Sequence, residues 1–188
     1  MSIISKDAVL LIIDVQKGFD EPYWGRRNNP QEEENIQRLL QLWRETKRPI
    51  YHVQHLSPKL NHPLRPNYIG SEIKDIVKPL TNEPVIQKNV NSAFIGTDLE
   101  ARLKQNGYNT LVIVGLTTDH CVSTTTRMAG NLGFKTYIVS DATATFDRKG
   151  HDGKVYKAED IHNISLVSLH GMFATVTNTQ KLIESSVM

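Results

Sequence analysis

The chain of 188 residues has one cysteine, little net charge and no apolar run of membrane-spanning length. A single cysteine excludes a disulfide within the chain, which is typical of proteins in a reducing compartment. The net charge of +2 indicates neither nucleic-acid binding nor attraction to anionic membranes. The apolar run at residues 8–13 is far shorter than the ~20 residues of a membrane span, and polar residues interrupt the N-terminal segment. We therefore expect a cytoplasmic protein that binds neither nucleic acid nor membranes and has no signal peptide.

Length and composition suit one globular domain. The chain is 39% hydrophobic and 22% charged, which is ordinary for a protein with one buried core. It has no internal repeat, no low-complexity tract and no linker between two apolar regions. We expect a single domain over residues 1–188.

Short apolar runs alternate with helix-like stretches along the whole chain. Six runs are predicted as strands, at residues 8–13, 49–53, 85–87, 110–114, 135–139 and 173–176. The first run is continuously apolar, which indicates a strand covered on both faces. Apolar residues at helical spacing follow the first strand, at Ile36, Leu39, Leu40 and Trp43. The alternation predicts an α/β fold with a mainly parallel sheet and helices on both of its faces.

Three chemically active residues follow predicted strands. In such sheets ligands bind beyond the carboxyl ends of the strands. Asp14 ends the first strand, Lys88 follows the third, and Cys121 lies in the loop after the fourth. Each has a plain alternative, since Asp14 can be a turn residue, Lys88 a solvated side chain and Cys121 a small buried apolar residue. Together they predict a nucleophilic cysteine, an aspartate base and a lysine that orients the aspartate and favours the thiolate.

The loop before Cys121 also bears on its reactivity. If Thr118 or Asp119 caps the helix that follows, Cys121 falls in the first turn of that helix. The helix N-terminus then favours the thiolate, and a nearby ammonium lowers the pKa of the thiol further.

Several motifs in a fixed order carry a resemblance to a known family. They are DVQKGF at residues 14–19, KNVNSAF at 88–94, GLTTDHCV at 115–122 and SDATAT at 140–145. From residue 10 to about 177, the chain resembles the isochorismatase-like cysteine hydrolases, which include nicotinamidases, carbamoylsarcosine hydrolases and isochorismatases. The resemblance implies a three-layer α/β/α, Rossmann-like fold with a six-stranded parallel sheet. It also implies a catalytic triad of Asp14, Lys88 and Cys121, and a homodimer or homotetramer.

The same resemblance assigns an oxyanion hole. It implies a cis peptide bond between Leu116 and Thr117, ahead of the nucleophile. The backbone N–H groups of Thr117 and Cys121 are then expected to stabilise the oxyanion that forms during acyl transfer.

The metal-binding motif of nicotinamidases is missing from this chain. Those relatives carry an Asp-x-His element and a further histidine, whereas this chain has YHVQHLS at residues 51–57, with His62 beyond. His52, His55 and His62 could still gather a metal, but we interpret them as strand, loop and surface residues. We expect no metal, no other cofactor and no nicotinamidase activity.

The presence of Cys121 also narrows the class of reaction that the resemblance implies. Relatives that cleave isochorismate tend to lack it, so the resemblance favours hydrolysis of the C–N bond of a small amide. Two alternatives stay open: hydrolysis of a vinyl ether or ester, and a protein that binds a small molecule without turnover.

The substrate pocket is predicted only in outline. Phe19 and Trp24 are expected to form an aromatic wall, with Asn91 and His120 also contacting the substrate; each has a packing, turn or surface role as its alternative. Phe94 and Phe146 are weaker candidates. The loops at residues 24–30 and 147–153 are candidates for a lid.

Overall fold

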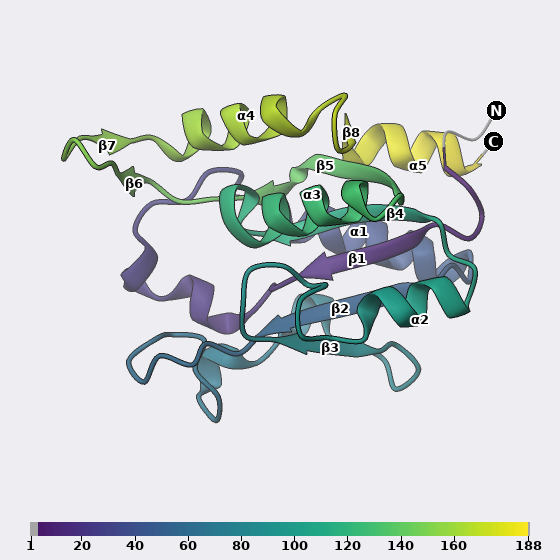
Figure 1. Ribbon diagram of the computed structural model, residues 1–188, viewed down its shortest axis with the longest axis horizontal. Helices are drawn as coiled ribbons and strands as arrows, with labels where there is room; N and C mark the ends of the chain where they lie inside the picture. Colours follow the sequence, from purple (N-terminus) through teal and green to yellow (C-terminus); the bar gives the residue numbers. More distant parts are fainter. Residues whose placement is uncertain (1–3, 188) are drawn as a thin grey trace.

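The computed structural model describes residues 4–187, and its centre is a six-stranded parallel sheet (Figure 1). The strand order is β3-β2-β1-β4-β5-β8, and every neighbouring pair is parallel. The strands are β1 (Val9–Ile13), β2 (Ile50–His55), β3 (Val85–Lys88), β4 (Thr110–Leu116), β5 (Lys135–Ala144) and β8 (Thr175–Thr177). A separate two-stranded hairpin consists of β6 (Arg148–Lys149) and β7 (Val155–Tyr156). The predicted six-stranded parallel sheet is confirmed.

Helices cover both faces of this sheet, as predicted. In Figure 1, α1 lies behind the sheet, and α2 and α3 lie in front of it. The helices are α1 (Glu32–Glu45), α2 (Leu99–Gln105), α3 (Ser123–Asn131), α4 (Ala158–Leu169) and α5 (Thr179–Val187). Short 3-10 turns lie at Lys17–Asp20, Pro22–Trp24, Ile69–Ser71 and Asp75–Val77, and a π-helical turn at Thr118–Val122 precedes α3. No helix within residues 4–187 combines the length and apolar character that crossing a membrane requires.

The position of β1 between two helical layers explains why its sequence is continuously apolar. Val9, Leu11 and Ile13 pack into the core beneath α2, α3 and α4. Leu10 and Ile12 point the other way, into the core beneath α1 and α5. Because successive side chains of a strand point to opposite faces, a strand between two helical layers needs apolar residues at every position.

A glycine allows the central strands to approach closely where the chain leaves the sheet. Gly115 of β4 has a φ of +113°, and a Cβ there would lie 2.0 Å from the backbone oxygen of Ile13. Only glycine fits such an approach. Asp14, the next residue of the neighbouring strand, has a φ of +53°, in the left-handed region that aspartate tolerates better than most residues. Both positions lie near the carboxyl ends of β1 and β4, where the chain leaves the sheet.

Candidate active site

Asp14, Lys88 and Cys121 meet at the carboxyl edge of the sheet. Lys88 Nζ donates a hydrogen bond to Asp14 Oδ2 at 2.6 Å and another to Cys121 Sγ at 3.3 Å. The side chains of Asp14 and Lys88 have no exposed surface. Three residues taken from separate sequence motifs therefore form one cluster, with Asp14 and Lys88 buried, Cys121 partly exposed, and the lysine between the carboxylate and the thiol.

The electrostatics of this cluster differ from the sequence-based expectation. Burial acts to lower the pKa of Lys88, but the charge of Asp14, together with the hydrogen bonds that Lys88 donates, outweighs it and raises that pKa, so Lys88 is an ammonium. Burial, and then the charge of Asp14, raise the pKa of the Cys121 thiol despite the nearby Lys88. The predicted lowering of that pKa is wrong for the resting site. Cys121 is a thiol that needs a base to become a nucleophile.

The loop before Cys121 is also built differently from the prediction. Cys121 lies in the π-helical turn Thr118–Val122, whose N-cap position is Thr117, not Thr118 or Asp119, and no side chain caps it. The Thr118 hydroxyl instead hydrogen-bonds His162 Nδ1 at 2.8 Å. The Asp119 carboxylate accepts hydrogen bonds from Arg148 and Thr145. These side-chain contacts hold the loop that carries Cys121. The sequence analysis did not predict the contacts with His162 and Arg148.

The backbone at Thr117 has the predicted peptide-bond conformation. The peptide bond between Leu116 and Thr117 is cis, as expected. The carbonyl of Thr117 accepts hydrogen bonds from the N–H groups of His120 and Val122. Thr117 and Cys121 both line the cavity. Their role as oxyanion donors stays a prediction.

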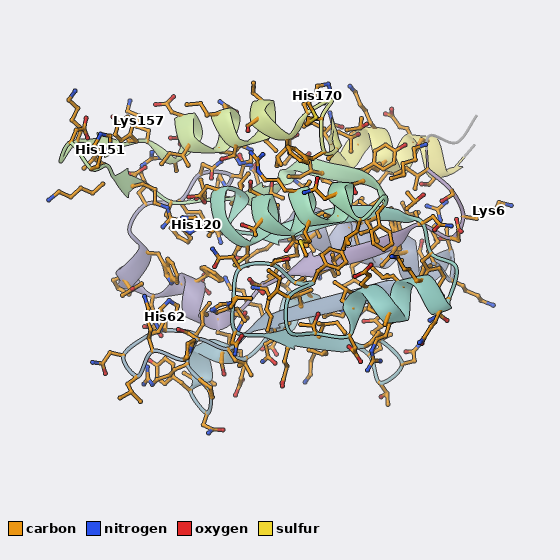
Figure 2. All side chains as sticks on the ribbon, in the orientation of Figure 1. Lys6, His62, His120, His151, Lys157 and His170 are labelled. Atoms are coloured by element: carbon orange, nitrogen blue, oxygen red, sulfur yellow. The ribbon has the colours of Figure 1, made fainter. Side chains whose placement is uncertain are left out.

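A cavity of about 650 Å³ is lined by Asp14 and Cys121. All four predicted substrate-contacting residues line it: Phe19, Trp24, Asn91 and His120. His62 and His120, both labelled in Figure 2, lie at the carboxyl end of the sheet, where this cavity opens. Whether these side chains bind the substrate stays a prediction, but their placement is as expected.

One wall of the cavity is aromatic. The ring centroids of Phe19 and Trp24 are 4.7 Å apart, and Phe146 stacks against Trp24 at 5.5 Å. Trp24 Nε1 donates to the carbonyl of Gly18 at 2.8 Å, which fixes the indole. Phe94, the other weak candidate, packs instead on Phe134 within the core.

Three cationic side chains line the cavity: Lys59, Arg148 and Lys149. Arg148 is held by Asp119 at 3.0 Å, whereas Lys59 and Lys149 make no ion pair with residues 4–187. Arg148 and Lys149 belong to the β6–β7 hairpin, which projects beyond the body of the molecule (Figure 1). Part of the predicted lid loop at 147–153 is thus a hairpin that lines the cavity.

The three histidines considered as metal ligands do not gather. His52 is buried and hydrogen-bonds Glu83 at 2.9 Å, whereas His55 and His62 line the cavity. Within residues 4–187, one group places three ligand atoms within 4.8 Å of one another: Asp14, His55 and Cys121.

That group does not fit a metal ion. Lys88 Nζ is within hydrogen-bonding distance of all three residues, so an ammonium already holds the position that a cation would need. A second positive charge there is unfavourable. No metal-dependent step is therefore assigned to this site.

His55 is the residue in the centre of the site that sequence reasoning did not assign a role. It is the last residue of β2, and it pairs in register with Lys88 of β3. The signal that identified Asp14 and Lys88, a polar residue at the end of a buried strand, also applies to His55. The loop interpretation of this histidine is wrong.

Comparisons with known proteins agree with this fold. Residues 8–181 match the family described as the Isochorismatase domain. The chain is 53% identical over 178 residues to the isochorismatase family protein YrdC of Bacillus subtilis, with 95% of each chain covered. A crystal structure of an isochorismatase-family hydrolase from Chromobacterium violaceum has a TM-score of 0.95 and 40% identity, covering 100% of this chain and 97% of that one. Nicotinamidase 3 of Arabidopsis thaliana is 26% identical over 195 residues, covering 96% and 89%. The chain belongs to the isochorismatase family of hydrolases.

Proposed function

We propose that this hydrolase cleaves the C–N bond of a small amide through a thioester on Cys121. The observation that carries the proposal is the position of Lys88 Nζ, 2.6 Å from a carboxylate oxygen of Asp14 and 3.3 Å from Cys121 Sγ. A thiol beside a carboxylate and an ammonium has the parts of an activated nucleophile. The similarity to a protein named nicotinamidase supports an amide as the target.

Asp14 is suited to remove the proton from the thiol. Its Oδ2 is held by Lys88, while its Oδ1 is buried without a hydrogen-bond partner in residues 4–187. This oxygen is the acceptor that we assign to the thiol proton. Once the proton moves from Cys121 to Asp14, the Lys88 ammonium stabilises the thiolate.

The remaining steps follow from the same groups. The thiolate attacks the carbonyl carbon, and the N–H groups of Thr117 and Cys121 stabilise the oxyanion. Asp14 returns its proton to the leaving nitrogen, and ammonia or an amine departs. Asp14 then takes a proton from water, which attacks the thioester to give the carboxylic acid and the free thiol.

The cavity lining suggests a preference among amides. Its aromatic wall favours an apolar or planar group, and the lining cations Lys59 and Lys149 lack ion-pair partners in residues 4–187. A carboxylate on the substrate would interact favourably with these cations. We therefore expect carboxylate-bearing amides to be cleaved faster than neutral amides of the same shape.

Ammonia release from a panel of small amides and ureides tests the proposal. The panel pairs each carboxylate-bearing compound with a neutral isostere and includes vinyl ethers and esters assayed for their own products. Wild type is compared with Cys121→Ala and with Cys121→Ser, which keeps the shape of the side chain. We expect amide cleavage by wild type that falls to background in both variants. Cleavage that survives Cys121→Ala would remove the cysteine from the mechanism, and turnover of vinyl ethers or esters alone would refute the amide.

A further inference from the structure

We propose that His55 is a positioning residue of this site, whose imidazole holds the Lys88 ammonium throughout the reaction. The inference rests on the proposed function for the order of the chemical steps. The contacts that carry it are those of Lys88, not those of a substrate.

The hydrogen bonds of the ammonium can be fully accounted for. An ammonium has three N–H donors and no acceptor. Lys88 Nζ has three partners: Asp14 Oδ2 at 2.6 Å, His55 Nδ1 at 3.1 Å and Cys121 Sγ at 3.3 Å. Each donor therefore has one acceptor, and His55 supplies the third.

This contact fixes the tautomer of His55. Because the ammonium only donates, Nδ1 must be unprotonated and the ring proton must lie on Nε2. Burial, and then the positive charge of Lys88, lower the pKa of His55 to about 4, while Asp14 opposes this and His62 adds to it. The imidazole is neutral at physiological pH.

The backbone of His55 is held from the neighbouring strand. The buried side chain of Gln16, just beyond β1, accepts a hydrogen bond from the His55 N–H at 2.8 Å. The same side chain donates to the carbonyl oxygens of His55 at 2.9 Å and Ser71 at 2.8 Å. Gln16 thus bonds both backbone groups of His55, beyond the last paired residues of β1 and β2, and holds the backbone that carries the imidazole.

The reaction explains why a third acceptor is useful. When Asp14 takes the thiol proton, it loses the charge that attracts the ammonium. When Cys121 becomes a thioester, its sulfur is no longer an anion. His55 is the one acceptor of the three whose protonation and bonding do not change in these steps. It keeps Lys88 in place while the other two partners react, which a bulky apolar residue in its position could not do.

Thiol alkylation tests this role without any substrate. Cys121 is the only cysteine, so the rate of iodoacetamide labelling reports the reactivity of this site alone. His55→Leu removes the acceptor, and His55→Asn keeps an acceptor atom near the position of Nδ1. His52→Leu is the control, because His52 is a buried histidine of the same strand that contacts Glu83 instead.

We expect labelling of His55→Leu at neutral pH to slow by about tenfold, as when the thiol pKa rises by one unit. Labelling of His55→Asn and His52→Leu should stay near the wild-type rate, with thermal melting used to confirm that each variant is folded. A wild-type rate and pH profile in His55→Leu would overturn the proposal. So would a rate in His55→Asn as low as that of His55→Leu, because shape rather than the acceptor would then matter.

The tautomer is tested on the unaltered protein, so the proposal remains falsifiable if His55→Leu does not fold. Nitrogen-15 NMR of labelled histidine should show a neutral His55 ring with its proton on Nε2 throughout the neutral pH range. A proton on Nδ1, or a charged ring, would overturn the proposal. Both measurements are independent of turnover. A panel without amide cleavage would therefore refute the proposed function while leaving these results to decide the contact of His55 with Lys88.

Discussion

Asp14 and Glu32 are both carboxyl groups with no exposed surface, yet their surroundings differ in one decisive respect. Asp14 accepts a hydrogen bond from the buried ammonium of Lys88. Neither oxygen of Glu32 has a hydrogen-bond partner in residues 4–187, and Arg27 Nη1 is 3.8 Å away. Burial raises the pKa of Glu32 to about 8, so this carboxyl group is mostly protonated at neutral pH.

The cations near Glu32 are already engaged with other groups. Arg27 bonds Glu33 at 2.8 Å, and Lys74 bonds both Glu33 and Asp20. Glu32 therefore becomes neutral by holding a proton, whereas Asp14 stays beside a cation of its own. A buried acid is available as a base only where the fold commits a cation to it. The two carboxyl groups are buried to the same degree, and only Asp14, the proposed base, has a cation hydrogen-bonded to it.

The largest difference should appear in catalysis. Asp14→Asn removes the proposed base without changing the shape of the side chain, and we expect activity to fall about 10²–10⁴-fold. Glu32→Gln makes the matched change at the other acid and should leave activity unchanged. Steady-state rates on the best substrate of the panel measure both variants. Equal losses in the two would contradict the assignment of the base.

The second difference concerns the cations nearest the two carboxyl groups, Lys88 beside Asp14 and Arg27 beside Glu32. Lys88→Met leaves Asp14 buried without its partner and should lower the free energy of unfolding by about 3–5 kcal/mol. Arg27→Met removes a cation from a protonated carboxyl group and breaks a partly exposed pair with Glu33, so it should cost no more than about 1 kcal/mol. Urea unfolding of the two variants at neutral pH makes the comparison. A larger loss in Arg27→Met would show that Glu32 is ionised.

The smallest expected effect is a pH dependence of stability. The pKa of Glu32 in the folded chain is about 8, above its ordinary value of 4.5. The folded state therefore holds a proton that the unfolded state releases between these pH values. Stability from the neutral carboxyl is complete below pH 4.5 and is lost as the pH rises towards 8.

The amide in Glu32→Gln cannot ionise. The free energy of unfolding of this variant should therefore not show the decline between pH 4.5 and 8 that comes from Glu32. The advantage of the variant over wild type should grow to about a few kcal/mol by pH 8 and then level off. Urea unfolding at a series of pH values gives the two curves. Parallel curves across this range would mean that Glu32 already carries its charge in the folded state.

The sequence was enough to predict that Asp14, Lys88 and Cys121 lie together, because strand topology places them at the same edge of the sheet. Asp14 directly follows β1 and Lys88 is the last residue of β3, and parallel strands end at one edge of the sheet. The position of Cys121 after β4 follows from the same rule. The local structure around Cys121 did not follow from that rule, because its π-helical turn depends on tertiary contacts. Thr118 contacts His162, and Asp119 contacts Arg148. Those partners are 29 or more residues further along the chain, beyond the reach of local patterns.

Burial was the other property that the sequence could not supply. Glu32 stands in the first turn of α1 beside Glu33 and Glu34, where acidic residues are ordinary and usually solvated. The raised pKa of the Cys121 thiol likewise comes from burial and from Asp14, which lies more than a hundred residues away in sequence. Electrostatics of this kind depends on the packed fold and not on the identity of neighbours in the chain.

The most direct test of the proposed nucleophile uses the fact that Cys121 is the only cysteine. The enzyme is alkylated in steps with iodoacetamide, and each sample is assayed for label per chain by intact mass and for amide hydrolysis. We expect activity to fall in proportion to the label and to reach zero at one label per chain, with substrate slowing the labelling. Fully labelled protein that retains its activity would show that the reaction does not pass through Cys121.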